Sequence, residues 1–152
     1  MTLTRVDHLT IAARFAAAPD DWPAAARFDP AQRWYHRLAA EADHEVWLLT
    51  WLPGQGTDLH DHGGSAGALH VVSGELTEDT VDTATGRVTV RRLGEGIGRR
   101  FGPRHVHRIV NLSSRPAVSI HAYGPALTSM TRYRLTPGGL ERVAVERAGA
   151  QW

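Results

Sequence analysis

The chain has 152 residues, with 17 lysines and arginines against 16 aspartates and glutamates, and a formal net charge of +1. This length fits one domain with a full hydrophobic core. The balanced charge does not favour nucleic acid or a charged membrane surface as a partner. Cysteine is absent, which excludes disulfides, thiolate metal ligands and a cysteine nucleophile. Any metal must therefore take nitrogen or oxygen ligands, and the expected ligand is a small molecule.

An apolar stretch near the N-terminus, LTIAARFAAAP, is the nearest approach to a targeting segment. Asp7 and Arg14 bracket too few apolar residues for a secretory signal. No later stretch is long enough to cross a membrane. We therefore expect a cytoplasmic protein with no membrane or nucleic-acid partner, acting as a monomer or a homodimer.

A helical segment is predicted at the front of the chain, over about residues 1–43. In DPAQRWYHRLAAEA, Asp29 is placed as an N-cap, Pro30 takes the first helical position and Gln32 completes a capping box. Apolar residues then recur along one side of the expected helix: Trp34, Tyr35, Leu38 and Ala42. The pattern predicts a helix over about residues 30–42.

A β-barrel is predicted over about residues 44–136, because short runs rich in β-branched and aromatic residues alternate with Gly, Pro and Ser. The predicted strands cover residues 45–52, 67–72, 75–82, 86–93, 107–112, 117–124 and 131–135. Many short strands at this spacing indicate an antiparallel barrel or sandwich. DTATGR, residues 82–87, predicts a hairpin turn. Residues 137–152 are expected to form a last strand or a tail, which makes residues 1–152 a single domain.

The stretch GQGTDLHDHGGSAGALHVVSGEL, residues 54–76, places His60 and His62 two positions apart. On an extended strand both side chains point to one face, where they can share an ion. In a chain with nine histidines such a pair alone is weak evidence. The glycines around the pair, and HRIVN with His107 four residues before Asn111, follow the spacing of the two cupin motifs. The chain therefore resembles the cupin family.

The cupin resemblance implies a mainly β fold, a double-stranded, jelly-roll-like β-barrel with a short N-terminal helical segment, in which His60, His62 and His107 converge on a metal. Cupins usually add a glutamate ligand five residues after the second histidine, and here that position is Gly67. Three neutral imidazoles leave a divalent ion its full charge and about three open positions. These ligand types also suit zinc, nickel or copper. His105 is the alternative third ligand, but the H-x-x-x-N spacing favours His107 and leaves His105 facing solvent or supporting the site.

The segment AVSIHAYGP, residues 117–125, carries a polar stripe, because strand alternation puts Ser119, His121 and Tyr123 on one face. Together with HDH and HRIVN, this segment resembles the cysteine dioxygenase family over about residues 51–125. The resemblance implies Fe²⁺ as cofactor, a Tyr123 hydroxyl offered to O₂ or substrate, and Ser119 and His121 as the residues that orient it. It also implies a cis bond at Gly124-Pro125.

Mammalian members of the family crosslink a cysteine to the tyrosine, and the matching position here is Gly67. A chain without cysteine cannot form this crosslink. In having glycine at this position, the chain resembles bacterial members of the family. The resemblance therefore implies the bacterial type of thiol dioxygenase.

Thiol substrates of the family usually carry a carboxylate, which a guanidinium binds through two parallel hydrogen bonds. Arg37 and Arg132 are the two candidate anchors, while Arg33, Arg99, Arg100 and Arg108 are expected to be surface or loop charges. The predicted function is oxidation of a small thiol carboxylate, cysteine or a close analogue, to the sulfinate. The alternatives are 3-mercaptopropionate or another thiol as substrate, a different metal-dependent cupin enzyme such as another dioxygenase or an isomerase, and a non-catalytic ligand-sensing cupin.

Overall fold

The computed structural model describes residues 7–148, which form one α-helix, one short 3-10 turn at Pro19–Asp21 and eleven strands. The helix, α1, covers His8–Ala16. The strands are β1 (Trp34–Ala40), β2 (Glu45–Trp51), β3 (Leu59–His60), β4 (Ala66–Ser73), β5 (Leu76–Val81), β6 (Val88–Leu93), β7 (Gly98–Phe101), β8 (His107–Val110), β9 (Ala117–Gly124), β10 (Ser129–Thr136) and β11 (Gly139–Arg147).

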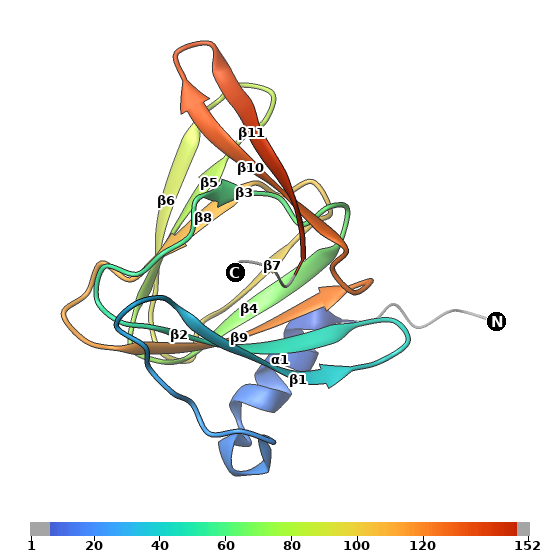
Figure 1. The fold of residues 1–152 in the computed structure, drawn as a ribbon, viewed down its shortest axis with the longest axis vertical. Coiled ribbons are helices and arrows are strands. Elements are labelled where there is room, and N and C mark those ends of the chain that lie inside the picture. The colour runs from blue at the N-terminus through green and yellow to red at the C-terminus, as the bar shows by residue number, and fades with distance from the viewer. Residues whose placement is uncertain (1–6, 149–152) are drawn as a thin grey trace.

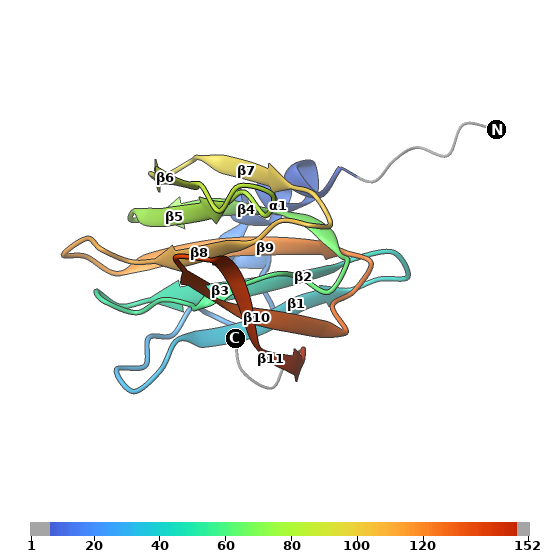
Figure 2. The same ribbon diagram turned by 90° about the horizontal axis from the view of Figure 1, so that it is seen from above.

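The strands form two antiparallel sheets that face each other (Figures 1 and 2). One sheet has the order β1-β2-β9-β4-β7 and the other the order β11-β10-β3-β8-β5-β6. Because strands far apart in the sequence pair with each other, such as β2 with β9 and β3 with both β8 and β10, the two sheets close around a shared interior. This is the mainly β barrel that the sequence predicts.

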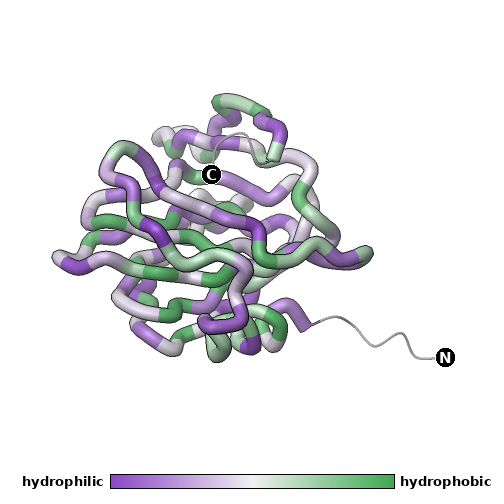
Figure 3. The backbone as a smooth tube through the Cα atoms, turned by 60° about the horizontal axis from the view of Figure 1, so that its bottom comes forward, coloured by the Kyte–Doolittle hydropathy of each residue, from purple (hydrophilic) through white to green (hydrophobic). Residues whose placement is uncertain are grey.

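Helix α1 covers the outer face of the five-stranded sheet (Figure 1). Its buried residue Ala12 packs against apolar side chains of β2 and β9: Val46, Leu48, Val118, Ile120 and Ala122. Along β9 these outward apolar residues alternate with polar ones, and such alternation is visible along several strands (Figure 3). The side chains of Ser119, His121 and Tyr123 therefore turn into the interior, as predicted.

The predicted helix over residues 30–42 is wrong, because these residues form strand β1, which pairs with β2. Asp29 does not cap a helix; its side chain accepts a hydrogen bond from the backbone N–H of Ala31 in a turn. Tyr35 packs edge-on against Trp47 of β2, with ring centroids 5.9 Å apart. Burial of aromatic side chains against a neighbouring strand outweighs local helix signals here.

The helix that does form begins at His8, after the N-cap Asp7, whose carboxylate accepts from the backbone N–H of Leu9. The predicted strand runs match strands of the structure, and DTATGR is the β5–β6 hairpin turn, with Gly86 at a φ of 74°. Strands β3 and β7 were not among the predicted runs, while the last strand expected as one alternative after residue 137 forms as β11. Within residues 7–148, no helix is long and apolar enough to cross a membrane.

Candidate active site

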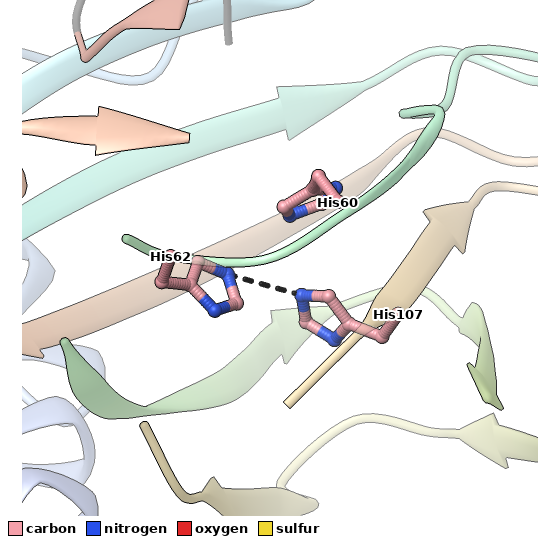
Figure 4. A group of neighbouring side chains, drawn as sticks. All are labelled: His60, His62 and His107. Atoms are coloured by element: carbon pink, nitrogen blue, oxygen red, sulfur yellow. Dashed lines mark hydrogen bonds between the residues drawn. The ribbon is translucent and has the colours of Figure 1, made fainter. Parts of the chain in front are cut away.

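Three buried histidines converge in the barrel interior: His60, His62 and His107. One ring nitrogen from each lies within 4.8 Å of the others, and Nε2 of His62 is 3.2 Å from Nε2 of His107. Figure 4 shows the three rings turned toward one another from two segments of the chain. The structure thus brings together the three residues that the sequence singles out as metal ligands.

The short strand β3 places two of these histidines. It lies between β10 and β8, and His60 is the cross-strand partner of both Arg132 and His107. His62 lies two residues after the end of β3, in a segment held by the side chain of Asp61, which points the other way. That carboxylate accepts hydrogen bonds from the backbone N–H groups of Gly63 and Thr131 and from a tyrosine hydroxyl, that of Tyr133. The H-D-H order therefore puts two imidazoles inward and the anchoring carboxylate outward.

Hydrogen bonds fix the tautomers of His60 and His107. Nδ1 of His60 lies 2.8 Å from the carbonyl oxygen of Asp58, and Nδ1 of His107 lies 2.8 Å from Oε2 of Glu78. A carbonyl and a carboxylate only accept, so in both rings the proton sits on Nδ1 and Nε2 is left with its lone pair. This is the orientation that a metal-binding imidazole takes.

Glu78, on β5, is fully buried and contacts His107 on the side of the ring that carries Nδ1. Its carboxylate bonds His107, His105 and Arg99. Burial alone would raise the pKa of Glu78, but the hydrogen bonds from the two histidines and the nearby charge of Arg99 lower it overall. Glu78 is therefore a carboxylate at neutral pH and can accept from His107.

His105 is not part of the cluster of His60, His62 and His107, although its ring centroid lies 4.7 Å from that of His107. Its Nε2 lies 3.2 Å from Oε2 of Glu78. Glu78, His105 and His107 also bring three ligand atoms close together. The ion pair between Glu78 and Arg99 already places a cation there, which disfavours a second one. Arg99 was expected to be a surface or loop charge, but it lies on β7 and is the ion-pair partner of a buried carboxylate.

All three converging histidines are neutral at physiological pH. Burial lowers the pKa of His60 and His62 well below the usual range, and the neighbouring imidazoles lower it further. Burial also lowers the pKa of His107, although its bond to Glu78 works in the opposite direction. Neutral imidazoles are the form that ligates metals, so protons do not compete with an ion here.

A chain of hydrogen bonds leads along β9 into the same interior. Nε1–H of Trp51 donates to Oγ of Ser119 at 2.9 Å, Oγ of Ser119 lies 2.8 Å from Nε2 of His121, and Nδ1 of His121 lies 3.2 Å from the hydroxyl of Tyr123. Burial lowers the pKa of His121 to about 3 and raises that of Tyr123. Both groups are therefore neutral at physiological pH.

The direction of the protons in this chain follows from Ser119. Among the described residues its hydroxyl has one acceptor, Nε2 of His121, since Trp51 can only donate to it. The serine proton thus goes to Nε2, which leaves the His121 proton on Nδ1, where it donates to the Tyr123 oxygen. His121 therefore donates to the Tyr123 hydroxyl, so in this bond the phenol oxygen is the acceptor.

A cavity of about 120 Å³ adjoins the histidines. Its walls include His60, His107, His121, Tyr123 and Arg33. Arg33 was expected to be a surface or loop charge; it does lie in the segment just before β1, but it lines the cavity. Its guanidinium lies 5.0 Å from the centre of the Trp51 ring, and its Nη1 is buried with no hydrogen-bond partner among residues 7–148.

Burial lowers the pKa of Arg33 to about 10, so the group remains charged at neutral pH. Within residues 7–148 the guanidinium has no carboxylate at ion-pair distance although it is largely buried; such a cation is costly, and an anion in the cavity would offset that cost. Sequence reasoning missed this residue because the incorrect helix assignment placed it on a helix surface. The aromatic pair after it, Trp34 and Tyr35, is the signal for a strand entering the barrel wall.

The two arginines named as anchors lie elsewhere. Arg37 is half exposed, pairs with Glu45 at 3.9 Å and stacks over Trp47; it does not line the cavity. Arg132 does reach the cavity wall, but it is ion-paired with Glu146 at 3.0 Å and Asp58 at 3.5 Å. Arg100 and Arg108 form ion pairs at the surface, as expected.

The barrel matches known folds. A conserved protein with a double-stranded β-helix domain from Klebsiella pneumoniae has a TM-score of 0.58 at 18% identity, covering 93% of this chain and 99% of that one. A Cupin_2 domain of an XRE family transcriptional regulator from Enterobacter cloacae has a TM-score of 0.50 at 23% identity, covering 60% of this chain and 94% of that one. The fold is therefore that of the cupins.

Within the cupins, the family model described as Cysteine dioxygenase type I matches residues 3–135, so the chain belongs to this dioxygenase family. Cysteine dioxygenase type 1 of Danio rerio is 28% identical over 126 residues, covering 76% of this chain and 62% of that protein. Cysteine dioxygenase type 1 of Homo sapiens is 26% identical over 144 residues, which cover 86% of this chain and 70% of that protein. The chain thus spans less than two thirds of the length of the Danio rerio protein. The peptide bond Gly124-Pro125 is cis, as the family resemblance implies.

Proposed function

We propose that the protein is a non-haem iron thiol dioxygenase, which oxidises the thiol of a small thiol carboxylate, cysteine or a close analogue, to the sulfinate. The reaction is RSH + O₂ → RSO₂H: both oxygen atoms end on sulfur, which loses four electrons, and O₂ gains them. The observation that carries the proposal is one small cavity that adjoins the histidine cluster through His60 and His107 and is also lined by Tyr123 and Arg33.

The donor set fits a divalent metal. His60, His62 and His107 are buried and neutral, and the first and last of them present a bare Nε2. Among the described residues no carboxylate joins this group, and Gly67 stands at the position of the usual cupin glutamate. Family membership favours iron, and bound Fe²⁺ would supply a site for thiolate and O₂ together and lower the pKa of the thiol. The protein then needs no strong base of its own to deprotonate the substrate.

Arg33 is the group that we propose to bind the substrate carboxylate. Its buried Nη1 has no protein partner among the described residues, and the planar guanidinium can bind a carboxylate through two parallel hydrogen bonds. Stacking over Trp51 holds its position. A substrate fixed at one end by Arg33 has few ways to lie in a cavity of about 120 Å³, so its thiol is directed to the histidine cluster.

Tyr123 is proposed to act as a hydrogen-bond donor to the reacting oxygen or sulfur. Its phenol is neutral, Tyr123 lines the cavity, and the chain from Ser119 through His121 donates to the phenol oxygen and so orients the hydroxyl. A donor that is already oriented stabilises charge as it develops on oxygen and needs no reorganisation. Ser119 and His121 act through Tyr123 by fixing the direction of this proton.

Arg132 leaves 3-mercaptopropionate and other thiols as alternatives to cysteine, because it too lies on the cavity wall. Its pairing with Glu146 makes it the weaker carboxylate anchor. A different metal-dependent cupin enzyme would share the histidine cluster but has no use for the phenol donor. A ligand-sensing cupin would bind a thiol without turnover.

The test is oxygen uptake by the Fe²⁺-loaded protein with cysteine, 3-mercaptopropionate, cysteamine, mercaptosuccinate and a bulky heteroaromatic thiol. We expect uptake with a small thiol carboxylate and one equivalent of sulfinate per O₂. The bulky thiol should give none, because the cavity is small. Full iron loading without uptake for any thiol would overturn the proposed reaction and favour the other cupin functions.

A further inference from the structure

The three proposed ligands are not held in the same way. The carbonyl of Asp58 fixes the ring of His60, and the carboxylate of Glu78 fixes the ring of His107. His62 has no such partner: its Nδ1 is buried and makes no hydrogen bond within residues 7–148. A metal-binding histidine ordinarily donates its second ring N–H to an acceptor that sets its orientation. Its Nε2 lies 3.2 Å from Nε2 of His107, but these are the two nitrogens that would face a shared ion. With an ion bound, no hydrogen bond to a described residue would set the ring of His62.

The ring of Phe101 contacts His62 face to face. The ring centroids lie 4.6 Å apart, with an angle of 22° between the planes. The ring of His105 also stacks on this phenyl ring, with centroids 5.3 Å apart and an angle of 17° between the planes. The centroid of the Tyr123 ring lies 6.0 Å from that of Phe101. Phe101 is nearly fully buried, so it is packed in one place. Its contact with His62 is the closest aromatic stacking in the site.

Gly67 makes room for this ring. Phe101 ends β7 and is the cross-strand partner of Gly67 on β4. A Cβ at position 67 would lie 2.8 and 2.9 Å from two carbons of the phenyl ring and 2.3 Å from the carbonyl oxygen of Ala122. No side chain fits there while Phe101 keeps its place. The φ angle of Gly67 is not positive, so the need for glycine is steric and not conformational.

We propose that Phe101 is a positioning residue for the metal centre: seated in the space left by Gly67, its ring holds the imidazole of His62 in the orientation in which it can share an ion with His60 and His107. Stacking thus does for His62 what hydrogen bonds do for the other two rings. The proposal rests on the metal site of the proposed function, but it does not depend on which thiol is oxidised.

The test replaces Phe101 with Leu, which keeps apolar bulk without a flat face, and measures the Fe²⁺ dissociation constant by competition with a chromophoric chelator. Phe101→Tyr is the conservative variant, and Phe101→Met is a second variant in case the leucine protein does not fold. Leu48→Ala is the matched control, since Leu48 is buried in the core under α1 and away from the site. The absorption spectrum of the Co²⁺-loaded proteins reports the ligand geometry directly.

We expect Phe101→Leu and Phe101→Met to raise the dissociation constant about tenfold, as the loss of a residue that orients a ligand does, and to change the Co²⁺ spectrum. Phe101→Tyr should stay within twofold of the original protein. Leu48→Ala should lower the melting temperature and leave the affinity unchanged. Unchanged affinity and spectrum in Phe101→Leu, beside a lowered melting temperature, would make Phe101 only a core residue. Failure of the unsubstituted protein to bind Fe²⁺ would instead overturn the metal site itself.

Discussion

The indole of Trp51 contacts both Arg33 and Ser119. The guanidinium carbon of Arg33 lies 5.0 Å from the centre of its ring, and its Nε1–H donates to Oγ of Ser119 at 2.9 Å. One fully buried side chain therefore supports the proposed carboxylate anchor with its face and the hydrogen-bond chain to Tyr123 with its edge. The anchor and the phenol donor are held in a fixed relation to each other, which substrate positioning requires.

Replacing Arg33 with Gln should impair binding of carboxylate substrates selectively. We expect the KM for cysteine to rise about thirtyfold, roughly 2 kcal/mol, because the substrate carboxylate loses a buried charged partner. Turnover of cysteamine, which has no carboxylate, should change little. Steady-state oxygen uptake with both thiols measures the difference.

The matched control is Arg37→Gln, because Arg37 is half exposed and paired with Glu45 outside the cavity. It should leave the KM for cysteine within a factor of two. A large rise in Arg37→Gln together with none in Arg33→Gln would return the anchor to Arg37 and contradict the assignment.

Replacing Tyr123 with Phe should slow turnover without weakening metal binding. The change removes one oxygen atom from a site where an oriented hydroxyl faces the cavity, so we expect kcat to fall about a hundredfold. Ser119→Ala should give a smaller loss, since it frees the direction of the phenol proton and leaves the donor in place. The measurements are kcat with saturating thiol and the Fe²⁺ content of each variant. An active Tyr123→Phe with full iron would favour a cupin reaction that does not use the phenol.

The sequence predicts the barrel and the histidine cluster because both depend on short-range patterns. Alternation along β9 assigns Ser119 and His121 to the interior with no knowledge of the neighbouring strands. The two-residue spacing of His60 and His62 likewise assigns both imidazoles to one face of the chain at β3. In each case the period of the strand decides the direction of the side chain, and the structure agrees.

Residues that depend on pairing between distant strands were not predicted. Glu78 reaches His107 because β5 pairs with β8, which no local signal indicates. Arg33 enters the cavity because β1 adds to the edge of β2, while its local sequence has the capping pattern of a helix. Phe101 matters through its pairing with Gly67. Long-range register, and not residue type, determines these three roles.

Replacing Glu78 with Gln should weaken metal binding. Glu78 holds Nδ1 of His107 and neutralises Arg99 from a fully buried position, so the neutral amide leaves Arg99 uncompensated and weakens the bond to His107. We expect the Fe²⁺ dissociation constant to rise at least tenfold. Glu75→Gln, which removes the partner of Arg92 at the surface, is the control and should have no effect. Equal affinities in the two variants would contradict the supporting role of Glu78.

The metal-free protein should lose stability as the pH falls below about 6.5. His121 is buried and neutral, and burial lowers its pKa to about 3, whereas in the unfolded chain it titrates near the usual value of about 6.5. Between these two pH values the unfolded state binds a proton that the folded state does not. The contribution of His121 to stability is thus fully present above the unfolded pKa and declines at about 1.4 kcal/mol per pH unit as the pH falls toward 3.

Urea unfolding of the chelator-treated protein at several pH values between 7 and 4 measures this dependence. His60, His62 and His107 also have lowered pKa values, so their contributions have the same sign, and a steep fall in the free energy of unfolding is expected. His121→Gln has no group to protonate at this position. The free energy of unfolding of this variant should therefore fall less steeply with pH, by about 1.4 kcal/mol per pH unit. Identical slopes in the two proteins would show that His121 is already protonated in the fold, and the neutral hydrogen-bond chain to Tyr123 would then be wrong.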